Sequence, residues 1–421
     1  MLSPAPIHVI GMHPGSLHLP EGTERIAATA DVLVGGKRLL AAHALACSPD
    51  EPSCPSIQVP ISGPLGMVIK KIQLEYAAGR KVVVLADGDP LYFGFAKRLI
   101  KEFGADNVQV HPSLTCVQLA AARLNLTWRR MAVVSLHGRE DHAPLFAAMM
   151  RTDTVAVFTD QKNDPPAIAK ALLDKGAADH DMTVLEDLGT PQERIRAMRP
   201  EEAWDLELSP LNLVLIQRRY PPEHPPRLDL PDHLFLTEAE LITKRPVRAA
   251  GLACLGIEPE DTVWDLGSGS GAVAIEAAGL ARYGRVVAVE RNRRRAAAIR
   301  ENVRRTGAWL VDVVRGEMPG CLEALPAPDR IFLGGGLGGP SNQGNRLMET
   351  ACERLRPRGR LVIHCILLDT LHTAKQHIQD LGWHFGMTQI QASTADHLAG
   401  DLRFKAENPV FILWAEKPDL R

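Results

Sequence analysis

The sequence predicts an α/β protein of two domains, the second of them built on a doubly wound, Rossmann-like parallel sheet. Apolar β-type runs alternate with helical stretches along most of the chain. A proline-rich stretch between Tyr220 and Pro231 interrupts this alternation near the middle. Because 421 residues are too many for one ordinary core, the interruption is read as a domain boundary.

The first domain is expected to span residues 1–220. Its strand-like runs alternate with helical stretches rich in Ala, Leu, Lys and Arg, which predicts an α/β sandwich. The strand-like runs are residues 7–10, 81–85, 131–135, 154–158 and 211–216.

The second domain is expected to span residues 235–421, after an extended and semi-rigid connector at 221–234. Helical segments of a dozen or more residues separate its strand-like runs, which is typical of a doubly wound parallel sheet. These runs are residues 262–266, 285–290, 330–333 and 360–364.

Composition excludes several classes of partner. The 48 basic and 50 acidic side chains nearly cancel, so no global field favours nucleic acid or an anionic membrane, and a small-molecule partner is expected. No apolar run approaches the length of a membrane span, and the N-terminus has no secretory pattern, so a cytoplasmic protein is expected. The scattered cysteines include no Cys-x-x-Cys pair, which argues against zinc or a disulfide framework. They are Cys47, Cys54, Cys116, Cys254, Cys321, Cys352 and Cys365.

A glycine-rich turn opens the second domain. The apolar strand at 262–266 carries Asp265 and leads into Gly267, Ser268, Gly269, Ser270 and Gly271, after which a helix is expected. Glycines at such a turn let a ligand touch the backbone, and the N–H groups at the start of the helix favour a carboxylate or phosphate. Glu290 ends the next strand, where its carboxylate can accept hydrogen bonds from two ribose hydroxyls.

Two other interpretations fit part of this turn. A purely structural strand-to-helix turn is the plainer one, but it leaves Asp265 and Glu290 unexplained. A nicotinamide site also ends its second strand in an acid, but its glycine spacing differs. The order Asp-x-Gly-x-Gly-x-Gly instead resembles class I methyltransferases, in which the acid helps to hold the methionine end of S-adenosylmethionine.

Two basic clusters flank the turn. Thr243, Lys244, Arg245 and Arg248 precede the cofactor strand, either as a solvated helix face or as a clamp for substrate carboxylates, and composition alone leaves both open. The cluster at 291–295 follows Glu290 and is expected to open a surface helix rather than to bind nucleic acid.

Glycines also follow the fourth strand, at 334–336, on the side of the sheet where substrate meets cofactor. They are expected to make an open floor. The Asn/Asp-Pro-Pro-aromatic motif of enzymes that methylate the amines of bases is missing here. Methylation of carbon in a bulky substrate fits this floor better.

Short motifs at strand ends mark the first domain. The turn at 11–15 is weak evidence alone, and Asp87-Gly88-Asp89-Pro90 is more specific, because Asp89 can cap a helix that begins at Pro90. The further segments are 112–113, 135–139, 159–160, 186–193 and 212–214.

Taken in order, these segments resemble the tetrapyrrole (corrin/porphyrin) methylase family over residues 7–218. That resemblance implies two α/β subdomains holding S-adenosylmethionine between them, and residues 30–38 with 186–189 resemble the branch that methylates C5 of precorrin-6Y. Residues 235–415 are similar to the domain that methylates C15 and decarboxylates the C12 acetate. Departures from the usual pattern are His13 in the first loop and Ala86 where serine is more common.

The resemblance implies one S-adenosylmethionine site per domain, no metal, and catalysis by positioning, with no catalytic side chain assigned. The cofactor-binding residues it implies are Gly11, Pro14, Gly15, Asp87, Gly88, Asp89, Ser113, Asp265, Gly267, Ser268, Gly269, Gly271, Glu290, Gly316, Gly334 and Gly335. Thr243, Lys244, Arg245 and Arg248 are the candidates for binding the carboxylates of a tetrapyrrole substrate.

Alternatives stay open at this point. The substrate is either cobalt-free or a cobalt-containing precorrin. Another interpretation is an RNA or protein methyltransferase fused to a non-catalytic carrier domain, although few aromatic residues are available to stack on bases. Domains of both kinds associate, so a homo-oligomer is expected.

Overall fold

The computed structural model describes residues 5–46, 57–203, 205–239, 241–335, 337 and 343–419. Cys47, Cys54 and Gly336 lie outside the described residues. The chain folds into two compact units, one of residues 1–138, 156–167 and 181–216 and the other of residues 139–155, 168–180 and 217–421. Within the described residues, no helix combines the length and the apolar character needed to cross a bilayer.

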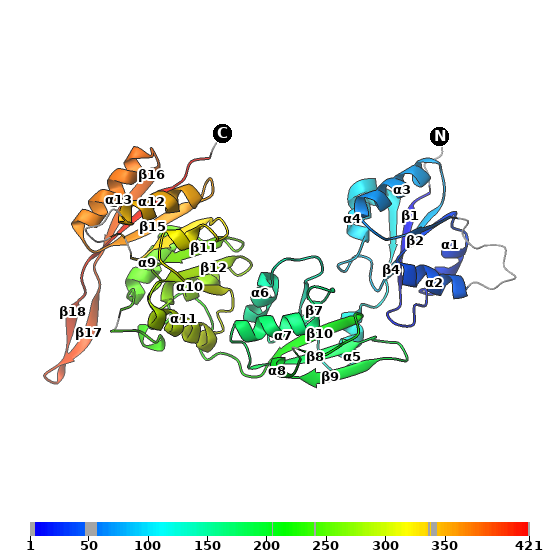
Figure 1. Ribbon diagram of the computed structural model, residues 1–421, viewed down its shortest axis with the longest axis horizontal. Helices are drawn as coiled ribbons and strands as arrows, with labels where there is room; N and C mark the ends of the chain where they lie inside the picture. Colours follow the sequence, from blue (N-terminus) through cyan, green and yellow to red (C-terminus); the bar gives the residue numbers. More distant parts are fainter. Residues whose placement is uncertain are drawn as a thin grey trace. The chain divides into compact units, whose positions relative to one another are not determined.

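The first sheet is parallel, with the strand order β3-β2-β4-β1-β5 (Figure 1). The strands are β1 (Ile7–Met12), β2 (Val32–Gly35), β3 (Ile57–Pro60), β4 (Val82–Asp87) and β5 (Val108–His111). The accompanying helices are α1 (Glu24–Ala28), α2 (Lys37–Ala46), α3 (Leu65–Ala77), α4 (Ala96–Phe103), the 3₁₀ turn η1 (Ala105–Asn107) and α5 (Cys116–Arg123). Two apolar clusters, one containing Val9 and Val84 and the other Ile10 and Leu85, form the core of this region. Because β1 and β4 are adjacent and parallel, the loops that follow them meet at one edge of the sheet.

The second sheet has the order β6-β7-β10-β8-β9. Its strands are β6 (Ala132–Ser135), β7 (Thr154–Phe158), β8 (His180–Glu186), β9 (Arg194–Met198) and β10 (Asn212–Arg218). The helices of this region are α6 (Ala143–Arg151), α7 (Pro165–Asp174) and α8 (Pro200–Ala203). The two sheets confirm the predicted α/β fold of the first half of the chain.

The third sheet has seven strands in the order β13-β12-β11-β14-β15-β19-β16, of which the first five are parallel. Its strands are β11 (Thr262–Leu266), β12 (Arg285–Glu290), β13 (Val311–Arg315), β14 (Arg330–Leu333), β15 (Arg360–Cys365), β16 (His384–Ile390) and β19 (Val410–Glu416). The helices of this region are η2 (Asp232–Leu234), α9 (Arg245–Leu255), α10 (Ala272–Leu280), α11 (Arg293–Thr306), η3 (Gly320–Leu322), α12 (Gln343–Arg354) and α13 (Leu368–Asp380). The predicted doubly wound parallel sheet is confirmed, and β19 adds an antiparallel edge.

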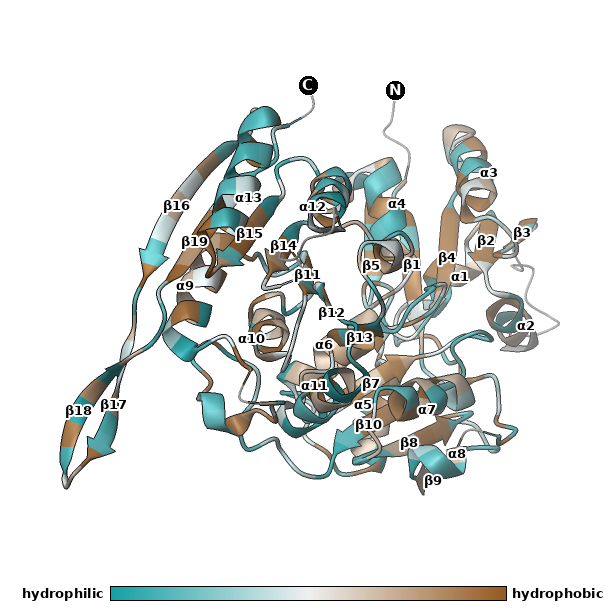
Figure 2. Cartoon of the chain, turned by 60° about the vertical axis from the view of Figure 1, so that its left-hand side comes forward, coloured by the Kyte–Doolittle hydropathy of each residue, from teal (hydrophilic) through white to brown (hydrophobic). Residues whose placement is uncertain are grey.

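Burial follows the hydropathy of these elements. Apart from Glu276, helix α10 is apolar on all sides, and it is buried from Ala272 to Ala278, as expected for a helix packed inside a layered fold. Figure 2 shows β19 mainly brown and the outer helix α13 mainly teal, so the apolar strands carry the core and the polar helix face meets solvent.

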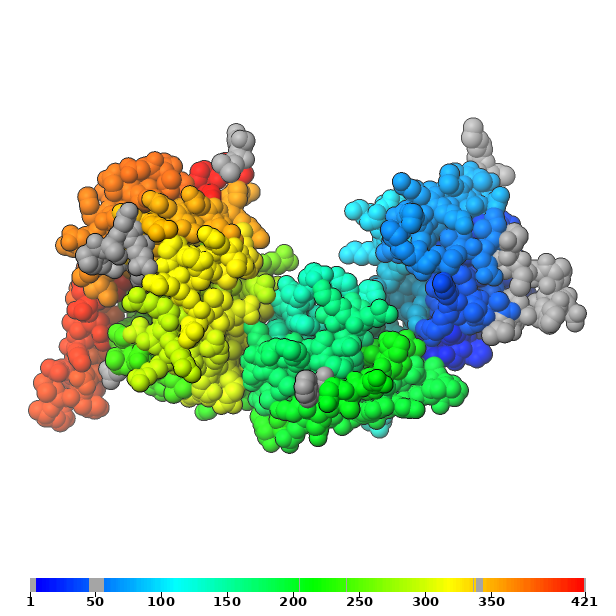
Figure 3. Space-filling model, in the orientation of Figure 1, coloured from blue at the N-terminus to red at the C-terminus, as the bar shows by residue number. Residues whose placement is uncertain are grey.

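A two-stranded arm extends from this region (Figures 1 and 3). Strands β17 (Ser393–Leu398) and β18 (Asp401–Ala406) pair with each other, and every residue of both strands is exposed. Ala399 and Gly400 both have positive φ, which matches the two-residue turn that suits a right-twisted hairpin.

The connector, predicted as an extended and semi-rigid segment, is packed against other residues of the second half. Leu230 is fully buried, and a Cβ on Gly279 of α10 would lie 2.7 Å from the carbonyl oxygen of Pro226. Asn302 of α11 accepts a hydrogen bond from the N–H of Leu236 at 2.8 Å and donates to its carbonyl. Residues 226–236 therefore pack along the helices of the second half.

Candidate functional site

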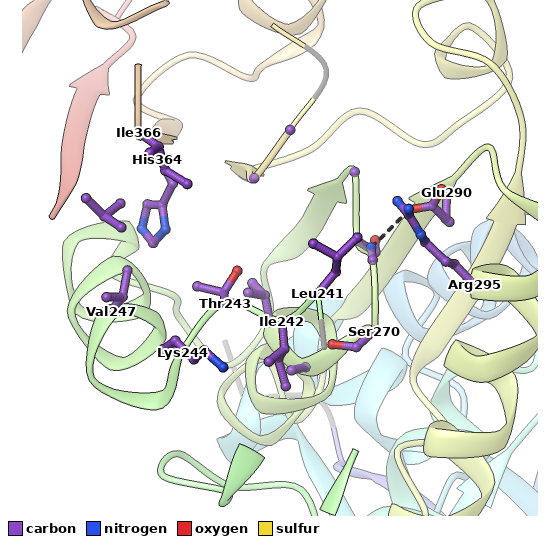
Figure 4. A pocket seen from close by; sticks show the side chains of 18 of the residues that line it. Leu241, Ile242, Thr243, Lys244, Val247, Ser270, Glu290, Arg295, His364 and Ile366 are labelled. Atoms are coloured by element: carbon purple, nitrogen blue, oxygen red, sulfur yellow. Dashed lines mark hydrogen bonds between the residues drawn. The ribbon is translucent and has the colours of Figure 1, made fainter. Parts of the chain in front are cut away.

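A cavity of about 690 Å³ lies at the carboxyl ends of the parallel strands in the third sheet, within the size range of cofactor and small-ligand sites (Figure 4). The turn after β11 and the end of β12 form one side of it. The loop before α9 and the end of β15 form another. The described lining residues include Leu241, Ile242, Thr243, Lys244, Val247, Gly267, Ser268, Gly269, Ser270, Ala272, Val273, Glu290, Arg291, Arg295, Glu317, Met318, Gly334, Gly335, His364, Ile366, Glu407, Asn408 and Val410.

The glycine turn adopts the conformation that the sequence predicts. Gly267, Gly269 and Gly271 all have positive φ, so each uses freedom that other residues lack. A Cβ on Gly271 would lie 2.7 Å from a methyl group of Ile299, so α11 packs directly against the turn. The turn thus presents bare backbone to the cavity at the start of α10, where N–H groups favour an anionic group.

Glu290 joins the turn to the next strand. Its carboxylate is 5% exposed, and its two oxygens accept hydrogen bonds from the N–H groups of Gly269 at 3.1 Å and Asn292 at 2.8 Å. These bonds fix the orientation of the carboxylate at the cavity wall. The remaining lone pairs suit a pair of vicinal hydroxyls, as in a ribose.

Asp265 lies beneath the turn rather than in the cavity wall. It is 1% exposed, and its carboxylate accepts a hydrogen bond from the N–H of Ala274 at 3.2 Å. Burial raises the pKa of Asp265 to about 7, and the nearby charge of Glu290 raises it further. Hydrogen bonds from Ser268 and Ala274 partly oppose this rise. Its charge therefore depends on pH in the neutral range.

The four predicted substrate-binding residues are separated by the structure. Thr243 and Lys244 line the cavity, whereas Arg245 is exposed outside it and forms an ion pair with Asp229. Arg248 is fully buried: its guanidinium bonds to Glu276 at 2.9 Å and Asp232 at 2.9 Å. Arg248 also donates to the carbonyls of Thr243 and Leu230, so its donors are committed inside the protein. The prediction that Arg248 binds substrate carboxylates is therefore corrected. Its role is structural, because its partners are all within the protein.

Three further assignments have distinct outcomes. The expected surface helix after Glu290 is α11, capped by the Asn292 side chain, and Arg295 in its first turn pairs with Glu238 at 2.8 Å. Gly334 and Gly335 line the cavity, as the open floor requires. Gly316 is not a lining residue of this cavity: a Cβ there would lie 2.5 Å from the Cβ of Cys321, and Glu317 and Met318 line the cavity instead.

Sequence reasoning missed His364 and the segment at 407–410. The His364 ring meets Phe332 edge-on at 4.5 Å between centroids, and a Cβ on Gly251 would lie 2.3 Å from its Nε2. Burial lowers the pKa of His364 to about 4, so the imidazole is neutral at neutral pH. The position of His364 near the end of β15 was a usable signal, whereas residues 407–410 offered none, because they reach the cavity only through the path of the chain after the arm.

The predicted residues of the first half also come together. A Cβ on Gly11 would lie 2.1 Å from the carbonyl oxygen of Gly88 and 3.1 Å from Ser113, so three strand-end turns touch at this glycine. Gly15, at φ 77°, lies equally close to Gly189, where a Cβ would meet backbone at 2.4 Å. The motifs at 11–15, 87–90, 113 and 186–193 thus surround one place in the fold.

Asp87 and Asp89 differ in their surroundings. Burial raises the pKa of Asp87, and an ion pair with Arg38 opposes that rise. Asp89 accepts a hydrogen bond from the N–H of Leu91 at 2.9 Å, but the expected helix does not begin at Pro90. Turns and bends occupy residues 90–95, where Phe93 has a φ of 55° that a right-handed helix does not accept, and α4 begins at Ala96.

Comparisons with known proteins match both halves. Residues 6–203 match the family model described as tetrapyrrole (corrin/porphyrin) methylases, and residues 234–417 match the model described as a precorrin methyltransferase domain. A Sinorhizobium protein named precorrin-6Y C(5,15)-methyltransferase (decarboxylating) is 31% identical over 412 residues, which cover 96% of this chain and 94% of that protein.

Two Salmonella typhimurium proteins are similar to parts of the chain. A cobalt-precorrin-6B C(15)-methyltransferase (decarboxylating) is 33% identical over 190 residues, covering 45% of this chain and 96% of its own length. A cobalt-precorrin-7 C(5)-methyltransferase is 30% identical over 213 residues, covering 50% of this chain and 98% of its own length. With the near full-length match to the Sinorhizobium protein, the chain belongs to the family of precorrin-6Y C(5,15)-methyltransferases (decarboxylating).

Proposed function

We propose that this chain transfers methyl groups from S-adenosylmethionine to C5 and C15 of precorrin-6Y and decarboxylates the C12 acetate, as a step in building the corrin ring of cobalamin. The observation that carries the proposal is the match of nearly the whole chain to a protein named for this activity. The glycine turn of the second half agrees with it, since Gly267 and Gly269 line the cavity with backbone atoms alone.

The two activities are assigned to separate sites, one per domain. Residues 1–220 are proposed to methylate C5, and residues 235–421 to methylate C15 and release carbon dioxide. The two Salmonella proteins support this division, because each carries one of the two activities in its name and aligns with about half of this chain.

The residues of the second half fit S-adenosylmethionine. Glu290 would accept hydrogen bonds from the ribose hydroxyls, and the turn at 267–271 would approach the methionine end with backbone atoms alone. The bound cofactor supplies an electrophilic methyl group on sulfur. The electron-rich ring carbon is the nucleophile. The protein therefore needs chiefly to hold this carbon in near contact with the methyl carbon and in line with the bond from that carbon to sulfur.

Lys244 is the cation proposed to anchor a substrate carboxylate, because it lines the cavity while Arg245 and Arg248 are paired elsewhere. Lys244→Met should raise KM for the tetrapyrrole at the C15 step about tenfold, through loss of one charge-assisted hydrogen bond. Arg245→Met should change this KM less than twofold. Equal effects of the two substitutions would show that the basic cluster acts through its general charge and not through Lys244.

The pKa of Asp265 predicts a pH-dependent affinity for the cofactor in the second half. The carboxyl is protonated below about pH 7 in the free protein, and the positively charged methionine end favours its ionised form. Affinity should therefore fall as pH decreases through 7, approaching about tenfold per pH unit well below it. Titration calorimetry from pH 5.5 to 8.5 checks this, and Asp265→Asn should flatten the profile. A wild-type profile as flat as that of the variant would remove Asp265 from cofactor binding.

We also expect a homo-oligomer, and the arm of β17 and β18 is the surface proposed to form it. A two-stranded ribbon is marginal without further packing, yet Leu402 and Phe404 on β18 are 61% and 79% exposed. Replacing both with Ser should convert the oligomer to smaller species in light scattering. A monomeric wild-type chain, or an unchanged oligomer in the variant, would contradict this use of the arm.

The activity itself is tested by mass spectrometry of the product formed from precorrin-6Y by the purified full chain with S-adenosylmethionine. Gain of two methyl groups with loss of carbon dioxide is the expected result. An unchanged tetrapyrrole would reject the proposed substrate.

A second candidate is the same chemistry on a cobalt-containing precorrin. The names of the two Salmonella proteins support this candidate, since both specify cobalt-precorrins. Competition between cobalt-containing and cobalt-free substrates in the same assay distinguishes the two.

A further inference from the structure

We propose that Tyr92, Phe93 and Phe158 form an aromatic platform on which the first half of the chain binds the flat conjugated face of its tetrapyrrole, beside the cofactor turns. The inference rests on the proposed function and names the residues that would hold the methyl acceptor there.

The three rings form one cluster from two distant segments of the chain. Phe93 lies 5.1 Å from Tyr92 and 5.5 Å from Phe158 between ring centroids, and Tyr92 lies 6.4 Å from Phe158. Tyr92 and Phe93 follow β4, and Phe158 ends β7 (Figure 1). Phe93 is nevertheless 57% exposed and Tyr92 37%, so the cluster presents ring surface to solvent.

The backbone holds Phe93 outward at a cost. Its φ of 55° lies in the left-handed region, which is unfavourable for an aromatic residue. The loop is fixed by the N–H of Tyr92 donating to the carbonyl of Asp89 at 3.1 Å, and a Cβ on Gly94 would lie 2.2 Å from the carbonyl oxygen of Pro90. Strain of this kind persists mainly at functional sites, where a geometry must be kept.

The platform borders the cofactor turns of the first half. Phe93 lies three residues after Pro90, at the end of the Asp87–Pro90 motif. The Tyr92 phenol lies near enough to Cys116, the first residue of α5, for the two groups to interact electrostatically, and Cys116 interacts in the same way with Asp87. The rings are thus next to two of the turns that meet at Gly11.

This location identifies the occupant. A methyl acceptor must lie in near contact with the methyl donor, so a surface that borders the donor turns is where the acceptor must lie. A tetrapyrrole offers a broad conjugated face with its carboxylates at the periphery. Aromatic side chains bind such a face by stacked and edge-on contacts, without needing charge at the centre.

The test uses the full chain with precorrin-6Y as probe and follows the C5 methyl group separately from the C15 methyl group. Phe93→Ala and Phe158→Leu should each raise KM for C5 methylation about tenfold, with little change in kcat, because stacking holds substrate and transition state alike. S-adenosylmethionine affinity should be unchanged. Tyr220→Ala, at a residue that is 72% exposed just before the connector, is the matched control and should leave this KM unchanged.

Phe93→Gly separates binding from folding. It removes the ring and relieves the unfavourable backbone, so the thermal midpoint should not fall while KM rises as in Phe93→Ala. If wild type methylates C5 and KM is unchanged in these variants, the platform is refuted and the proposed function stands. A change in oligomeric state with unchanged KM would show a protein interface instead and would also refute it. Absence of any C5 methylation by wild type would overturn the proposed function and the platform together.

Discussion

Glu290→Ala should remove cofactor binding from the second half of the chain and leave the first half active. The substitution deletes the acceptors proposed for two ribose hydroxyls and the bonds to Gly269 and Asn292 that order the turn. Each hydrogen bond to a charged group contributes about 1.5–3 kcal/mol, so affinity at this site should fall by roughly 100-fold or more. The tetrapyrrole product should carry the C5 methyl group and retain its acetate.

Titration calorimetry gives the decisive measurement. The number of cofactor molecules bound per chain should decrease from two to one. Glu290→Gln should be intermediate, because the amide keeps one acceptor but turns an N–H₂ group toward an N–H donor. Glu407→Gln, at another part of the cavity wall, is the control and should leave cofactor affinity within twofold. Two cofactors bound tightly to Glu290→Ala would exclude Glu290 from the ribose site.

Arg248→Ala should strongly destabilise the second half. The substitution leaves Glu276, which is 1% exposed, without its ionic partner, and removes donors to Asp232 and two carbonyls. Breaking a buried ion pair on one side costs about 3–5 kcal/mol. For a unit of this size the thermal midpoint of its unfolding transition should fall by about 10 °C.

Two further variants distinguish an unpaired charge from simple loss of contacts. Arg245→Ala breaks an exposed ion pair and should change stability by less than about 1 kcal/mol. The double variant Arg248→Met, Glu276→Leu removes both buried charges and should recover most of the lost stability. If the double variant is as unstable as Arg248→Ala, the cost lies in packing and in the bonds to Leu230 and Thr243.

The sequence was most informative where structure is local. The turn at 267–271 and the acid at Glu290 were predictable because a strand end, glycines and a helix start are consecutive in the chain. The strand-end motifs of the first half were predictable for the same reason, and the structure brings Gly11, Gly88 and Ser113 into contact.

The sequence was least informative where a residue's role depends on what packs over it. Lys244, Arg245 and Arg248 are basic residues close together in the sequence, but Lys244 lines the cavity, Arg245 pairs with Asp229 at the surface and Arg248 is buried. The partners of Arg248 come from two distant segments, at Asp232 and Glu276, which the sequence does not reveal. The platform was missed because Phe93 and Phe158 are far apart in the chain and meet only in the folded unit.

The packed connector sets where the chain can be cut. The N–H of Leu230 donates a hydrogen bond to Glu276, and its carbonyl accepts one from Arg248. The N–H and the carbonyl of Leu236 are both hydrogen-bonded to the side chain of Asn302. A protease needs several residues of extended, unpaired backbone, so residues 226–236 should resist limited digestion despite their prolines. A fragment that begins at residue 235 would lose the Leu230 bonds and keep only those of Leu236. One that begins before Pro222 would keep both sets and also the packing of Pro222 beside Gly307.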